Sequence, residues 1–204
     1  MVSPPGLHVT SPDDALRARS WLHIRHLIDL CADLGPDGVM VFGSPKQRAA
    51  TGGSTVQEAT RRFIDGLASA SGHAAGRQVR ILVEALPKNQ TDVVGTLREA
   101  VAIVDEIVSP GVRAMFDTHN AADETEPHGQ IVARYLPYVS HVHVNETDGK
   151  HCGRGDYDFK PVLRALRDGD YRGWISLEAF DFSFGAEVIA RESINFLKSE
   201  IERL

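Results

Sequence analysis

The sequence predicts an α/β protein in which parallel strands alternate with helices. Short apolar runs, rich in valine, isoleucine and phenylalanine, alternate with longer runs whose apolar residues recur at helical spacing. Successive strand candidates lie about 30 residues apart, the size of a βαβ unit. This alternation favours a parallel sheet covered by helices. A doubly wound sheet and a (β/α) barrel both fit the pattern, and the first candidate strand is followed by neither a dinucleotide-type glycine fingerprint nor a P-loop.

The first two units are predicted from short apolar runs and their stops. Residues 6–11 form a short candidate strand. Residues 13–35 carry leucines at helical spacing and end at Gly35, a typical helix stop. The next strand, residues 38–45, ends in a glycine and a proline.

The remaining elements repeat the same alternation. The helix over 54–76 begins with Ser54 and Glu58, a pair close to a capping box. The other predicted strands cover residues 79–85, 112–118, 139–145 and 174–180. The other predicted helices cover residues 92–107, 126–136, 158–171 and 186–204. The pattern therefore predicts six strand–helix units in one domain, residues 1–204.

The composition limits the class of partner. The chain has 204 residues and a formal net charge of −6, which disfavours nucleic acid as a partner. Its two cysteines are too few for a disulfide scaffold. It begins with no signal-peptide pattern and has no apolar run of the roughly 20 residues that span a membrane. We therefore expect no membrane association and a cytoplasmic location.

Four consecutive predicted strands place a metal-ligand residue type near their carboxyl ends: Glu84, Asp117, His143 and Glu178. In a parallel barrel this end of the sheet carries the active site. Any one of these acids alone could be a helix cap or a solvated side chain. Three carboxylates gathered together need a cation, however, and carboxylates with one imidazole suit Mn²⁺, Mg²⁺ or Co²⁺. The alternation of side chains along a strand puts His141 on the same face as His143, one layer below.

Five segments carry a resemblance to a known family: "VFGSPKQR", "ILVEAL", "MFDTHNA", "HVHVNETDG…GRGDYDF" and "RGWISLEAF". They resemble the xylose isomerase-like TIM barrel superfamily, in its sugar phosphate isomerase/epimerase branch, and most of all the D-tagatose and D-psicose 3-epimerases. The resemblance runs from about residue 6 to the C-terminus.

The resemblance implies a (β/α) barrel and a metal-dependent sugar isomerase or epimerase. The counterparts of Glu84, Asp117, His143 and Glu178 hold one divalent cation, usually Mn²⁺. Glu84 and Glu178 are also the implied acid/base pair, which acts through an enediolate on a sugar or polyol. Homodimers are common in the family, so a homodimer is a further expectation.

The substrate residues depart from the family pattern. Asn120 stands where a histidine is usual, with His119 one residue earlier; Gln90 replaces a glutamate, and Gly149 replaces an arginine. Glu146 matches. The predicted substrate-binding residues are Lys46, Gln90, His119, Asn120, Glu146 and Arg154. Arg48, close to Lys46, is expected at the same rim.

The family barrel has eight strands, and six units are recognised here. The first two βα units are therefore expected to be missing, which a truncated chain, a second subunit or an open sheet would each explain; truncation is the favoured reading. Competing functions are an inosose-type dehydratase, a phosphodiesterase related to AP endonucleases, and an inactive truncated barrel. The phosphodiesterase is disfavoured because it needs more histidine and aspartate ligands.

Overall fold

The computed structural model describes residues 4–204, which divide into two compact units, one ending at Ala114 and the other covering Met115–Leu204. The strands follow one another in sheet order: β1, β2 and the start of β3 in the first unit, and the end of β3, β4 and β5 in the second. Their bounds are β1 Val39–Phe42, β2 Arg80–Val83, β3 Val112–Asp117, β4 Val139–Val144 and β5 Trp174–Leu177. Five of the six predicted strands and the α/β class are confirmed.

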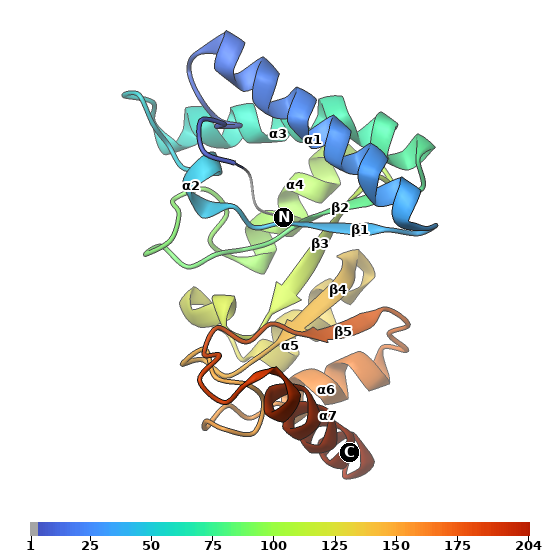
Figure 1. Cartoon of the computed structure of the whole chain (residues 1–204). Coiled ribbons are helices and arrows are strands. Elements are labelled where there is room, and N and C mark those ends of the chain that lie inside the picture. The colour runs from blue at the N-terminus through green and yellow to red at the C-terminus, as the bar shows by residue number, and fades with distance from the viewer. Residues whose placement is uncertain (1–3) are drawn as a thin grey trace. The chain divides into compact units, whose positions relative to one another are not determined.

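In the first unit, β1 pairs in parallel with β2, Met40 opposite Ile81, and β2 pairs with β3, Ile81 opposite Val112. The helices are α1 Asp14–Leu34, α2 Pro45–Arg48, α3 Val56–Gly76 and α4 Leu97–Ile107. Figure 1 shows α1 and α3 lying side by side over β1 and β2.

The predicted strand at residues 6–11 is wrong, because this segment is folded as turns. Its polar groups are bound elsewhere: the Val9 N–H donates to the Gln47 carbonyl at 2.8 Å, and the Trp21 indole N–H donates to the Val9 carbonyl at 3.1 Å. With its backbone groups bound to α2 and to a side chain of α1, the segment does not join the sheet.

Two helix starts differ from the prediction because a threonine supplies the cap. Thr55, not Ser54, accepts from the Glu58 N–H, while the Glu58 carboxylate accepts from the Thr55 N–H. Thr96 and Glu99 make the same capping box, so α4 begins at Leu97 rather than at residue 92.

An aromatic cluster of Trp21, Phe42 and Phe63 fills the core of the first unit, with ring centroids 5.1–6.3 Å apart. Gly66 of α3 makes room for it. A Cβ on Gly66 would lie 1.9 Å from Trp21 Cε2, so only glycine lets α3 come this close to α1.

In the second unit, β4 and β5 are parallel neighbours, with His143 opposite Ser176. The helices are α5 His128–Tyr135, α6 Lys160–Asp168 and α7 Ala186–Glu202, with short 3-10 turns η1 Asn120–Asp123 and η2 Leu136–Tyr138. β4 is largely buried, whereas Trp174 at the start of β5 is 79% exposed. No helix within residues 4–204 is long and apolar enough to span a membrane.

Candidate metal centre

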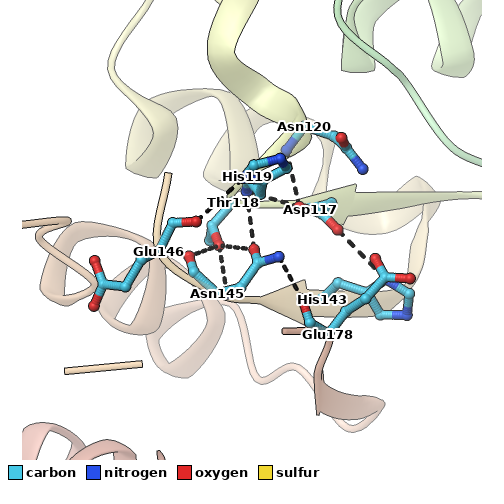
Figure 2. Close-up of polar contacts among 8 residues, drawn as sticks. All are labelled: Asp117, Thr118, His119, Asn120, His143, Asn145, Glu146 and Glu178. Atoms are coloured by element: carbon cyan, nitrogen blue, oxygen red, sulfur yellow. Dashed lines mark hydrogen bonds and ion pairs between the residues drawn. The ribbon is translucent and has the colours of Figure 1, made fainter. Parts of the chain in front are cut away.

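Three of the predicted ligands belong to the second unit and stand at the carboxyl ends of successive strands. Asp117 ends β3, His143 is the penultimate residue of β4, and Glu178 directly follows β5. His143 Nδ1 lies 3.0 Å from Glu178 Oε2 and 3.4 Å from Asp117 Oδ2 (Figure 2). One ligand atom from each residue falls within 4.8 Å of those of the other two. The second unit therefore gathers two carboxylates and one imidazole at one point.

The two oxygens of Asp117 have different surroundings. Oδ1 accepts the N–H groups of His119 at 2.7 Å and Asn120 at 2.9 Å, a cap for the chain entering η1. Oδ2 is buried and accepts no hydrogen bond in the described part of the chain. A buried carboxylate oxygen without a hydrogen bond is costly unless a cation meets it. The residues present therefore fit a divalent cation.

The carboxylates also set the charge of His143. Burial alone would lower its pKa, but the contacts with Asp117 and Glu178 outweigh burial and raise the pKa of His143 to about 9. For Asp117, burial would raise the pKa, but the contact with His143 and the Asn120 N–H more than offset this and lower it. A histidine must give up its proton to bind a metal ion, so binding of a cation through His143 Nδ1 would release that proton.

His141 lies beneath His143, as predicted, with the two ring centroids 5.1 Å apart. It is buried, and burial together with the charge of His143 lowers the pKa of His141 to about 4. It is therefore a neutral group that packs under the ligand.

Glu84, the fourth predicted ligand, belongs to the first unit and follows β2. It is 5% exposed, and its carbonyl accepts from Arg48 Nη1 at 2.7 Å. Gly43 gives its carboxylate room, since a Cβ there would lie 2.5 Å from Glu84 Oε2.

Arg48 lies at the carboxyl ends of β1 and β2, as expected, but it is not a solvated side chain. Its side chain is 0% exposed and donates to the carbonyls of Phe42 and Glu84 at 3.0 and 2.7 Å. Burial lowers the pKa of Arg48 to about 10, against the attraction of Glu84. Lys46 and Gln90 lie in the same unit and are exposed.

Glu146 shapes the loop that follows β4. It is 1% exposed, and its two carboxylate oxygens accept the N–H groups of Gly153 at 2.8 Å and Tyr157 at 3.0 Å. A Cβ on Gly155 would lie 2.6 Å from Glu146 Oε2. The carboxylate is thus enclosed by its own loop, and its predicted substrate contact stays a prediction.

Arg154, in the same loop, is bound to α7. Its guanidinium donates twice to the Glu192 carboxylate, both at 2.7 Å, and lies over the Phe184 ring. Buried His151 contacts the same carboxylate at 3.0 Å. These contacts attach the loop to α7, which agrees with an ordering role for Arg154.

His119 and Asn120 lie beside Asp117. The His119 Nδ1–H donates to the Glu146 carbonyl at 3.2 Å, and its ring lies 5.0 Å from that of Phe180. Asn120 is 4% exposed.

The backbone conformation at Gly149 disfavours any side chain there, including the arginine of the family pattern. Its φ of +83° is one that side chains disfavour, and its carbonyl accepts the N–H groups of Phe180 and Asp181 at 2.8 and 3.0 Å. A Cβ would lie 3.3 Å from Phe180 Cβ. This position joins the loops after β4 and β5.

Two site residues, Thr118 and Asn145, were not predicted from the sequence. Both are 0% exposed and are hydrogen-bonded to each other beside the ligands (Figure 2). Each follows a predicted ligand by one or two positions, and nothing in their spacing distinguishes them from ordinary strand-end residues.

The fold and the cluster define an α/β protein of barrel type with a carboxylate–imidazole site of metal-binding character. The chain belongs to the xylose isomerase-like TIM barrel family, whose model matches residues 1–200.

The similar proteins include sugar epimerases. An L-ribulose 3-epimerase of Methylomonas sp. (strain DH-1) is 26% identical over 192 residues, which make up 93% of this chain and 64% of that protein. The chain thus spans less than two thirds of this curated relative.

Two solved structures share the fold. One is a structure of L-ribulose 3-epimerase, with a TM-score of 0.85 and 19% identity over 98% of this chain and 73% of that one. The other is D-psicose 3-epimerase in the presence of D-fructose, with a TM-score of 0.83 and 20% identity over 97% and 76%. These similarities confirm the barrel type of the fold predicted from the sequence, and the chain spans about three quarters of each of these structures.

Proposed function

We propose that this chain carries the catalytic centre of a divalent-metal-dependent sugar isomerase or epimerase. The observation that carries the proposal is the cluster of Asp117, His143 and Glu178, in which Asp117 Oδ2 is buried without a hydrogen bond. Oxygen ligands with one imidazole and no thiolate favour Mn²⁺, with Mg²⁺ or Co²⁺ as substitutes. The family and the epimerase relatives support the same reading.

Glu84 is proposed as the fourth ligand. It follows β2 as Glu178 follows β5, and β2 pairs in parallel with the start of β3, the strand that Asp117 ends. Parallel strands present their carboxyl ends at the same edge of a sheet. The Arg48 contact with its carbonyl and the space at Gly43 then serve to orient its carboxylate.

The proposed reaction is a proton transfer at a carbon beside a carbonyl. When bound, the cation would polarise the carbonyl and the adjacent hydroxyl and so acidify the C–H between them. One of the two glutamates removes that proton, and the other returns a proton to the opposite face of the resulting enediolate. Glu178 can reach a substrate, because its side chain is 40% exposed.

The proposed substrate is a ketose or related polyol. Lys46, Gln90, His119 and Asn120 remain the candidates for its hydroxyl groups, with Glu146 and Arg154 ordering the loop nearby. Because Gly149 and Gln90 replace an arginine and a glutamate, we expect a substrate preference that differs from that of the 3-epimerases. One domain over residues 1–204, a homodimer and a cytoplasmic location stay predictions from the sequence.

Deuterium exchange tests this function. The purified chain, loaded with Mn²⁺, is incubated in D₂O with a panel of ketoses, and loss of the proton on the carbon beside the carbonyl is followed by NMR. We expect exchange by the wild type and none by Glu178→Gln. Glu187→Gln, the same change at an 88% exposed position of α7, should exchange like the wild type. Full exchange by Glu178→Gln would refute the assigned role.

A further inference from the structure

Asn145 links the three segments that carry Asp117, His143 and Glu178. It follows β4 two positions after His143, and it is 0% exposed. Its side-chain amide donates from Nδ2 to the Glu178 carbonyl at 2.5 Å and accepts at Oδ1 from the His119 N–H at 3.1 Å (Figure 2). One side chain therefore bonds to the segment after β3 and to the segment after β5.

A second pair of hydrogen bonds fixes the backbone of Asn145 itself. The Thr118 hydroxyl donates to the Asn145 carbonyl at 2.7 Å and accepts from the Asn145 N–H at 2.9 Å. Thr118 directly follows Asp117. The segment that follows β3 is thus hydrogen-bonded both to the backbone and to the side chain of Asn145, which follows β4.

The His119 N–H connects this network to a ligand. It lies 2.7 Å from Asp117 Oδ1 and 3.1 Å from Asn145 Oδ1, so the two oxygens share one donor. Asp117 Oδ1 is therefore held by a backbone N–H group, and Oδ2 faces His143 Nδ1 at 3.4 Å.

Only an amide can make both side-chain bonds. Asn145 offers a donor to the Glu178 carbonyl and an acceptor to the His119 N–H. An aspartate of the same shape would place an oxygen against the Glu178 carbonyl oxygen, and alanine would leave that half-buried carbonyl without its donor.

We propose that Asn145 is a positioning residue that sets the spacing of Asp117, His143 and Glu178, and so the affinity for the divalent cation. The inference rests on the proposed function, since it assumes that these residues bind the cation. Groups that orient metal ligands typically contribute about 10–100-fold to metal affinity.

The test compares Mn²⁺ affinity, measured by calorimetry, in the wild type, Asn145→Asp and Asn145→Ala. We expect affinity to fall by about 10–100-fold in both variants. Asn195→Asp, the same change at an exposed position of α7, should bind like the wild type. Val142→Ala is the control for general destabilisation, because it creates a cavity at a buried position of β4. It should lower the melting temperature and change the Mn²⁺ affinity by no more than about twofold.

A second readout needs no metal. Hydrogen exchange of the metal-free protein, followed by mass spectrometry, should speed up in Asn145→Ala over residues 177–182 and 117–121, and should not do so there in Val142→Ala. Wild-type protein that fails to bind Mn²⁺ would refute the proposed function. The hydrogen-exchange result alone would then decide whether Asn145 holds the segments after β3 and β5 in place. Asn145 variants with wild-type affinity, or with unchanged exchange at both segments, would overturn the inference.

Discussion

Asp117 shows how one side chain can serve both the fold and the chemistry. The sequence leaves a helix cap and a metal ligand as competing roles for an acid at a strand end. The structure gives the capping contacts to Oδ1 and leaves Oδ2 beside His143. The two roles are therefore compatible, because they use different oxygens.

The sequence predicts which residues gather at the site where this depends only on their position at the end of a strand. Asp117, His143 and Glu178 were predicted from their place at strand ends, and the structure brings them together. Thr118 and Asn145 act through contacts between segments about 27 residues or more apart, which no local pattern encodes. The burial of Arg48 was not predicted, because it depends on three carbonyls from separate segments.

A pH dependence follows from His128, the first residue of α5. Its Nδ1 lies 2.7 Å from the Tyr157 hydroxyl, and burial lowers the pKa of His128 below its ordinary value of 6.5, against a backbone hydrogen bond. The unfolded chain therefore binds the proton more readily. The stability that His128 contributes is present above about pH 6.5 and is lost as pH falls through the lowered pKa of the folded state.

Urea unfolding at several pH values between 7.5 and 5 measures this effect. The free energy of unfolding should fall less steeply with acidification in His128→Gln, which keeps an acceptor for Tyr157 but does not titrate, than in the wild type. Identical slopes for the two proteins would show that His128 makes no such contribution.

At the scale of elements, apolar runs predicted six strands, of which five are present, each shorter than the predicted run. The segment 6–11 has the same apolar character, but its hydrogen bonds to Gln47 and Trp21 exclude it from the sheet. Helix starts were misjudged by a few residues, because Thr55 and Thr96 are caps only in the backbone conformation that the fold gives them.

Close packing of α1 on α3 predicts opposite effects for two glycines of α3. Gly66→Ala should destabilise the protein by about 1–3 kcal/mol, because the methyl group would overlap the Trp21 ring. Gly72→Ala, in the same helix with nothing within 4 Å of the added Cβ, should stabilise it by up to about 1 kcal/mol. Chemical denaturation measures both; equal effects would contradict the packing seen at Gly66.

At the scale of the whole molecule, the alternation of strands and helices predicted the α/β class, and the family motifs predicted the barrel type. The solved epimerase structures confirm that fold at about 20% identity. Under the proposed function, the changes from the family pattern at Gln90, Asn120 and Gly149 affect residues expected to bind substrate, whereas the four proposed metal ligands match the pattern. That combination is physically reasonable, since metal binding and sugar recognition use different side chains.

The central claim is that the cluster of Asp117, His143 and Glu178 holds a divalent cation. Calorimetric titration of Mn²⁺ into the chelator-treated chain tests it most directly. We predict one ion bound per chain by the wild type and by Glu187→Gln, and a loss of binding in Asp117→Asn, because the amide removes the charge of the oxygen left for the cation. Absence of binding by the wild type, or undiminished binding by Asp117→Asn, would contradict the account.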